Sequence, residues 1–174
     1  MKKPVDIRPE NPEDYIVIRQ INDQAFEQTD EGILIDKLRS SDAFIPELSL
    51  VAAIENKLVG HILFTRIKIE GAKKLINALA LAPMAVLPDH QGQGIGSRLV
   101  QAGLVSAKSL GFEAVIVLGH EKYYPRFGFE PASKWNIRAP FSVPDPVFMA
   151  LELEKGVLDG VEGIVEYAAP FMEL

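Results

Sequence analysis

A short glycine-rich run holds the residues best suited to binding chemistry: Gln91-Gly92-Gln93-Gly94-Ile95-Gly96. An apolar run at 75–87 precedes it, and a strongly helical pattern follows it from Gly94. A turn of this composition between a strand and a helix leaves several backbone N–H groups without a carbonyl partner. Those donors, aligned with the positive end of the helix dipole, predict a binding site for a phosphate group.

Two common phosphate-binding motifs do not fit this run. A dinucleotide fingerprint needs a glycine at the sixth position, where the chain, counted from Gly92, has Ser97. It also requires the first strand of the fold and an acidic residue about twenty positions later, and neither condition holds. A Walker loop ends in Gly-Lys-Ser/Thr, but here Gly96 and Ser97 are followed by Arg98 without a lysine. Both nucleotide-binding motifs are therefore excluded.

A third pattern fits the run and its surroundings. The order Gln-x-x-Gly-x-Gly between a strand and a helix, with Met84-Ala85-Val86 just before it, resembles the acetyl-CoA motif of the GCN5-related N-acetyltransferase (GNAT) family. The segment at 123–129, Tyr-Tyr-Pro-Arg-Phe-Gly-Phe, is similar to a bacterial subgroup of predicted N-acetyltransferases. The resemblance covers most of the chain. It implies the GNAT acyl-CoA N-acyltransferase fold, an α/β fold whose mostly antiparallel central sheet contains a splayed parallel pair and carries helices on both faces.

The resemblance assigns the glycine-rich run to the pyrophosphate of coenzyme A. Each glycine lets the backbone approach a phosphate without a Cβ in the way, and Gln91 would brace the turn. The strand before it would pair with the pantetheine arm through the backbones of Met84 and Val86, with Ala85 at a bulge that splays the strand. A plain core strand is the alternative for these three residues. The expected coenzyme-binding residues are Met84, Ala85, Val86, Gln91, Gly92, Gln93, Gly94, Ile95, Gly96 and Ser97.

The resemblance also implies a catalytic tyrosine beside the coenzyme sulfur. Tyr124 lies four residues before Gly128, which matches the position of that tyrosine in the family. A phenol is protonated at neutral pH and can donate a proton to the departing thiolate. The alternative is a half-buried aromatic residue whose hydroxyl has a structural partner. A shift of one residue in the alignment would exchange Tyr124 with Tyr123.

The attacking amine must lose a proton, so the site also needs a base. His120, at the end of the strand that enters the site, has a suitable intrinsic pKa, and Glu121 lies next to it. A surface histidine is the alternative, with a water chain leading to a distant carboxylate. The oxyanion is expected to bind a backbone N–H of the splayed strand, that of Val86.

Composition limits the classes of protein to which the chain can belong. It has 174 residues, a net charge of −6 and no cysteine, and we expect a single domain over 1–174. No apolar run is long enough to span a membrane and the N-terminus is polar, which favours a cytoplasmic protein without a membrane partner. The acidic balance argues against nucleic acid. Because cysteine is absent and His61 and His90 lack ligand spacing, no metal site is expected.

Apolar periodicity predicts the elements that must position these residues. The expected elements are a strand at 5–8, helices at 11–26 and 30–40, strands at 48–54, 58–69 and 75–87, a helix at 94–110, and strands at 113–119, 135–138 and 147–154. The strand, helix and strand around the glycine-rich run imply a right-handed crossover and a parallel pair. The whole pattern is a mixed sheet with helices on both faces.

The function predicted from these features is transfer of an acetyl group from acetyl-CoA to a primary amine by direct attack in a ternary complex. The absence of cysteine agrees with a mechanism that has no acyl-enzyme. The acceptor is a small-molecule amine or a protein or peptide amine, contacted by the first two helices, the loop at 42–48 and the proline-rich segment at 139–147; a homodimer is left open. The alternatives are a non-catalytic acyl-CoA-binding regulatory module and a transferase for a longer acyl group.

Overall fold

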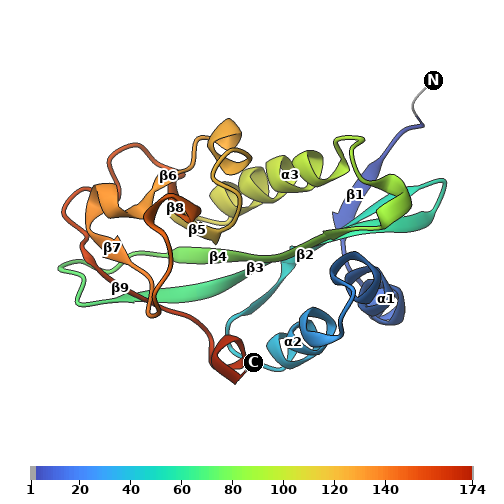
Figure 1. Ribbon diagram of the computed structural model, residues 1–174, viewed down its shortest axis with the longest axis horizontal. Helices are drawn as coiled ribbons and strands as arrows, with labels where there is room; N and C mark the ends of the chain where they lie inside the picture. The colour runs from blue at the N-terminus through green and yellow to red at the C-terminus, as the bar shows by residue number, and fades with distance from the viewer. Residues whose placement is uncertain (1–2, 174) are drawn as a thin grey trace.

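A computed structural model describes residues 3–173, and its central layer is a nine-stranded sheet (Figure 1). Along the main path the strand order is β1-β2-β3-β4-β5-β8-β6, and β9 pairs with both β3 and β7. Most neighbouring strands are antiparallel; β4 and β5 are parallel, as are β7 and β9. The strands are β1 Asp6–Pro9, β2 Phe44–Ile54, β3 Lys57–Glu70, β4 Ala78–Val86, β5 Ala114–Leu118, β6 Glu130–Pro131, β7 Ile137–Arg138, β8 Phe148–Glu152 and β9 Gly163–Glu166.

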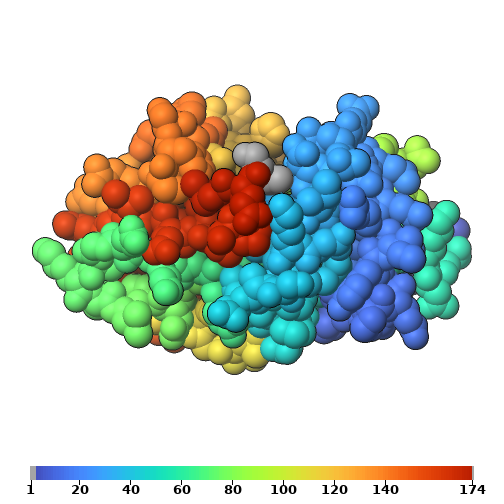
Figure 2. Space-filling view, turned by 90° about the horizontal axis from the view of Figure 1, so that it is seen from below, coloured from blue at the N-terminus to red at the C-terminus, as the bar shows by residue number. Residues whose placement is uncertain are grey.

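Helices cover both faces of this sheet (Figure 1). α1 (Tyr15–Phe26) and α2 (Asp30–Arg39) lie on one face, and α3 (Ile95–Ser109) lies on the other. Beside α2 lies the C-terminal turn η6 (Ala169–Glu173), drawn in red in Figure 2. Within residues 3–173, no helix combines the length and the apolar composition needed to cross a membrane.

α3 lies flat on its face of the sheet because it presents a broad apolar side. Leu99 and Val100 are fully buried in one cluster with residues of β3, β4 and β5. The close approach also needs a residue without a side chain, since a Cβ on Gly103 would lie 2.1 Å from Cε1 of Phe64. The packing therefore fixes the position of α3, and with it the turn at its N-terminus.

The two faces of the β4–β5 pair meet different surroundings. Side chains alternate along each strand, so Leu79 and Val115 point toward α3. Ala80 and Ile116 point to the opposite face, into a second buried cluster that contains Trp135. No helix of that face covers this part of the sheet; the segments that contain β7 and β9 cover it instead (Figure 1).

β4 and β5 separate part of the way along their length. Their parallel pairing ends at Ala80 opposite Ile116, while β4 continues to Val86. Just beyond this point the register of β4 against β3 shifts by one residue, so that Ala82 and Pro83 face a single residue of β3. A bulge of this kind bends and twists a strand. The splayed parallel pair is therefore present, but Ala85 is not its bulge: Ala85 pairs in regular register with His61.

Most expected elements are confirmed, with several differences at their ends. The helix at 94–110 is α3, the strand at 113–119 is β5, and the parallel pair is present. β2 begins at Phe44 rather than 48, because an irregularity in its register accommodates the exposed Pro46 and Glu47. β4 is shorter than 75–87, and Leu75 is exposed outside it. Trp135 belongs to a short 3-10 turn rather than to a strand at 135–138, and β9 was not predicted.

Candidate active site

The turn before α3 presents a series of backbone donors without acceptors. Gln91 N–H donates to the Pro88 carbonyl, and the next bonded amide along the chain is that of Arg98, which donates to Gly94. The N–H groups of 92–97 have no acceptor among the described residues. Positive φ angles of 76° at Gly92 and 82° at Gly94 produce this geometry, which other residues rarely adopt. The turn can therefore bind an anion at the N-terminus of a 15-residue helix.

A cavity of about 380 Å³ lies directly over this turn. A Cβ added at Gly92 or Gly94 would meet no atom within 4 Å, so the space next to the backbone is open. Gln93 faces away from this cavity and lines a different hollow beside the β2–β3 turn. The residues that line the cavity are Val86, His90, Gln91, Gly92, Gly94, Ile95, Gly96, Ser97, Tyr123 and Arg126.

The strand before the turn offers backbone groups to the opening between β4 and β5. Leu87 N–H donates to the Val59 carbonyl of β3 at 2.8 Å. In an antiparallel pair, every second residue of a strand forms its backbone hydrogen bonds with the same neighbouring strand. The backbone N–H and C=O groups of Ala85 therefore point toward β3. Those of Met84 and Val86 point to the opposite edge of β4, where β5 no longer pairs with it. The Val86 carbonyl on that side accepts a 3.0 Å hydrogen bond from Gln91 Nε2, which ties the strand to the turn.

Tyr123 and Arg126, on the opposite wall of the cavity, were not among the expected binding residues. The Tyr123 hydroxyl is 2.9 Å from Ser97 Oγ, so it lies at the start of α3. The Arg126 guanidinium is centred 5.0 Å from the Tyr123 ring. Arg126 gives the cavity a fixed positive charge, which complements the amide donors of the turn. The Tyr-Tyr-Pro-Arg order was visible in the sequence, but only the fold shows that its first and last residues face the glycines.

Tyr124 has different surroundings from its neighbour. It is 8% exposed and packs edge-to-face against Tyr123 and Phe129, at centroid distances of 5.0 and 5.7 Å. Its ring covers the end of β5, where a Cβ on Gly119 would lie only 2.4 Å from Tyr124 Cε2. Burial, with a smaller effect of Tyr123, raises the pKa of Tyr124 to about 12. The phenol is thus held protonated where the two strands separate.

His120 lies at the surface after β5. Its side chain is exposed, and its backbone carbonyl accepts the N–H groups of Tyr123 and Tyr124 at 3.1 and 3.3 Å. The structure thus brings His120 near Tyr124 in the chain, but gives its imidazole no partner among the described residues. The part of the chain that the structure describes also contains no group of three histidine or acidic residues that could hold a metal.

A small cavity of about 220 Å³ opens on the other face of the splayed strands. Part of its wall comes from Phe141 of the expected proline-rich segment. The rest of its outer wall comes from the C-terminal segment, which sequence reasoning missed although Tyr167 and Phe171 have a helical spacing of four. The lining residues are Ala80, Leu81, Ala82, Ile116, Leu118, Phe141, Tyr167, Phe171 and Met172.

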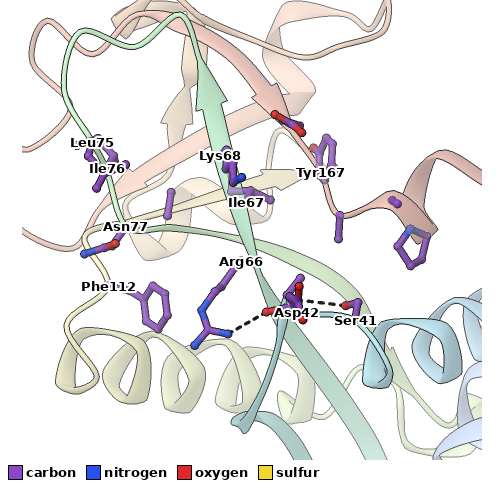
Figure 3. Close-up of a pocket in the computed structure, with 16 residues that line it drawn as sticks. Ser41, Asp42, Arg66, Ile67, Lys68, Leu75, Ile76, Asn77, Phe112 and Tyr167 are labelled. Atoms are coloured by element: carbon purple, nitrogen blue, oxygen red, sulfur yellow. Dashed lines mark hydrogen bonds between the residues drawn. The ribbon is translucent and has the colours of Figure 1, made fainter.

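A larger cavity of about 570 Å³ shares Tyr167 with the small one (Figure 3). Arg66 crosses it from β3 and donates to the backbone carbonyl of Asp42 at 3.2 Å, with Phe112 beside it. Asp42 belongs to the loop expected to contact the acceptor, but neither α1 nor α2, the two helices also expected to do so, lines either cavity. Because charged residues of both signs line it, the larger cavity contrasts with the uncharged small cavity next to the strands.

Comparison with known proteins places this geometry in a family. Residues 46–131 match the model of the acetyltransferase (GNAT) domain. The chain is 42% identical over 129 residues to the uncharacterised N-acetyltransferase YjhQ of Escherichia coli (strain K12), covering 74% of this chain and 71% of that protein. It is 34% identical over 166 residues to the uncharacterised N-acetyltransferase YhbS of the same strain, covering 95% and 97%.

Solved structures give the same result across nearly the whole chain. The crystal structure of YhbS from Escherichia coli in complex with CoA superposes with a TM-score of 0.91 at 31% identity, over 99% of this chain and 94% of that one. A GNAT family acetyltransferase from Brucella melitensis, in complex with acetyl-CoA, gives a TM-score of 0.79 at 34% identity over 98% and 99%. The chain belongs to the GNAT family of N-acetyltransferases.

Proposed function

We propose that the chain transfers an acetyl group from acetyl-CoA to a primary amine, by direct attack of the amine on the thioester while both substrates are bound. The observation that carries the proposal is the run of six amides at 92–97 that have no acceptor within residues 3–173, next to the separated end of β4. The two relatives crystallised with CoA and acetyl-CoA support it, since their folds match this one over almost the full chain.

The glycine turn binds the pyrophosphate in this proposal. Open space beside Gly92 and Gly94 allows the phosphate oxygens to approach the amides, and Arg126 adds a charge-assisted contact. The free backbone groups of Met84 and Val86 then pair with the amide-rich pantetheine arm, as an added strand would. Gln91 already occupies the Val86 carbonyl, so the Val86 N–H is the group left for the arm or for the oxyanion. The residues present therefore fit the coenzyme.

Tyr124 assists the departure of sulfur in this proposal. With its pKa at about 12, the phenol is a weaker acid than a thiol, whose pKa is near 8.5. It therefore acts mainly as a hydrogen-bond donor that stabilises negative charge as it develops on the sulfur. The proton lost by the amine balances the one gained by the thiol. His120, exposed just after β5, is the proposed first acceptor of the amine proton, directly or through water.

A thiol-release assay tests the proposal, and the chain suits it because it contains no cysteine that would react with the thiol reagent. We expect release that depends on both acetyl-CoA and an amine, with intersecting initial-rate lines when both are varied. Parallel lines would indicate an acyl-enzyme instead. Tight CoA binding without thiol release for any amine would support the alternative of a non-catalytic regulatory module. A faster reaction with succinyl-CoA or a longer acyl-CoA would contradict the acetyl assignment.

A further inference from the structure

The small cavity on the face opposite α3 is placed to hold the acceptor. Its walls include Ala80 and Ala82 of β4, and Ile116 and Leu118 of β5, on either side of the point where the strands part. The proposed coenzyme site lies toward α3, over the glycine turn. A molecule in the small cavity would therefore meet the thioester from the other side of the sheet.

The cavity is apolar and carries no charge. Of its nine lining residues, Tyr167 alone has an ionisable side chain, and burial raises the pKa of that phenol to about 12, so it is neutral. An ammonium or a carboxylate placed there would lose its hydration without gaining a partner, which is unfavourable. The charged residues of this region, such as Arg66 and Asp42, line the larger cavity on the far side of Tyr167.

Aromatic side chains form the outer wall. The Phe141 and Tyr167 rings are stacked, with centroids 6.0 Å apart and planes inclined by 17°, and Phe171 lies 5.3 Å from Tyr167. Three large apolar side chains around the cavity remain in part exposed to solvent: Leu118 at 45%, Phe141 at 40% and Met172 at 58%. Exposed apolar groups that gather around one hollow mark a binding surface, because covering them gains free energy.

From these features we infer the acceptor class: a small primary monoamine whose carbon skeleton is apolar, with room for one aromatic ring and no second charge close to the nitrogen. The inference rests on the proposed function and narrows its substrate. The volume of about 220 Å³ lies below the roughly 300–1,000 Å³ of pockets for drug-sized ligands, so the acceptor is small. Free α-amino acids, which carry a carboxylate beside the amine, and polyamines, which carry further ammonium groups, are excluded by the same uncharged walls.

A matched set of acceptors tests the inference with the wild-type protein. 2-Phenylethylamine and phenylalanine share one skeleton and differ by the carboxylate, while spermidine and a lysine-containing peptide represent the other acceptor classes. We expect kcat/KM for 2-phenylethylamine to exceed that for each of the other three by roughly a hundredfold or more. Transfer to spermidine, phenylalanine or the peptide at an equal or higher rate would overturn the inference and leave the proposed function intact. Release with none of them, despite CoA binding, would overturn both.

A variant of the aromatic wall provides the second test. Phe141→Ala removes one stacked ring from the exposed rim of the cavity, so we expect KM for 2-phenylethylamine to rise about tenfold while KM for acetyl-CoA stays within twofold. The matched control is Val105→Ala, which shortens a 72% exposed side chain of α3 outside the lining of the cavity and should change neither constant. An unchanged KM for the amine in Phe141→Ala would show that the ring does not contact the acceptor.

Discussion

Two adjacent tyrosines have different surroundings because the backbone between β5 and η3 (Tyr124–Phe127) turns them in different directions. Tyr123 directs its hydroxyl at Ser97, on the rim of the cavity over the glycine turn. Tyr124 covers Gly119 at the end of β5, and its hydroxyl has no hydrogen-bond partner among residues 3–173. An unpartnered, buried and neutral phenol is available to a substrate atom, whereas a phenol bound to Ser97 is already engaged. This difference favours Tyr124 as the residue that assists chemistry.

Replacing each hydroxyl in turn tests this assignment. Tyr124→Phe keeps the ring that fills the space over Gly119, so we expect normal folding, a turnover number lower by roughly a hundredfold, and acetyl-CoA affinity within twofold of wild type. Tyr123→Phe, the matched control, loses the Ser97 hydrogen bond and should weaken coenzyme binding a few-fold with little effect on turnover. Steady-state kinetics measure the turnover number of each variant, and calorimetric titration with CoA measures its coenzyme affinity. Equal losses of turnover and affinity in Tyr124→Phe would place its hydroxyl in binding instead.

At the scale of elements, the site depends on one strand and one turn that follow each other directly. The bulge at Ala82 and Pro83 moves β4 away from β5, and the turn beginning at Gln91 then aims free amides at the space created. The hydrogen bond from Gln91 to Val86 connects the two. Neither feature would suffice alone, because an acyl-CoA needs a groove for its arm and an anion site for its phosphates.

Gly94 is the residue of the turn whose replacement gives the clearest prediction. Its φ of 82° is strongly disfavoured for a β-branched residue, and the space beside it opens into the cavity over the glycine turn. For Gly94→Val we expect at least a tenfold rise in the dissociation constant for CoA, measured by calorimetry. Gly71→Val is the matched control, since Gly71 has a φ of 84° and open space but lies in the β3–β4 turn away from the site. Gly71→Val should lower stability and keep the affinity for CoA. An unchanged CoA affinity in Gly94→Val would contradict the assignment of the glycine turn to the pyrophosphate.

The limits of sequence reasoning also become clear at this scale. α3 and β5 were predictable because their apolar patterns are long and unbroken, and the glycine turn because its composition is rare. The bulge was placed at Ala85, although Pro83, which lacks an N–H and interrupts a ladder, was the available signal. The wall formed by Phe141, Tyr167 and Phe171 could not be predicted, because it joins two segments that become neighbours only when the sheet is complete.

Across the whole molecule, a polar cluster joins five parts of the chain on the face that carries α1 and α2: the segment after β1, both helices, β2 and β3. Ser49 of β2 donates to the Glu10 carboxylate and accepts from His61 Nε2 of β3 at 2.9 Å, which leaves His61 Nδ1 without a partner among the described residues. Arg39, at the end of α2, donates to the same carboxylate at 2.8 and 3.1 Å and lies 3.8 Å from the centre of the Tyr15 ring of α1. The cluster thus fastens both helices to the sheet, and its member His61 pairs directly with Ala85 of β4.

Ionisation of this cluster is expected to contribute to the loss of stability in acid. Burial lowers the pKa of His61, although Glu10 opposes the shift. Burial alone would raise the pKa of Glu10, but the His61 ring, 3.6 Å away, and hydrogen bonds from Arg39 and Ser49 outweigh it and lower that pKa to about 2. Both groups therefore bind protons less readily in the folded chain than in the unfolded chain, where their values are 6.5 and 4.5. The contribution of these two groups to stability is thus fully present above pH 6.5 and decreases as the pH falls.

The decrease should occur in two stages that denaturant unfolding at a series of pH values can separate. We expect the free energy of unfolding to fall below pH 6.5 because of His61, and to fall more steeply from about 4.5 toward 2 because of Glu10, each group contributing at most about 1.4 kcal/mol per pH unit. Glu10→Gln should cost roughly 3 kcal/mol at pH 7, because the nearly buried Arg39 loses its buried carboxylate partner and keeps only the more exposed Asp36, and it should remove the steeper stage. Glu47→Gln, at an exposed carboxylate of β2, is the control and should leave the profile unchanged. A Glu10→Gln profile as steep as that of wild type below pH 4.5 would assign acid sensitivity to other carboxylates.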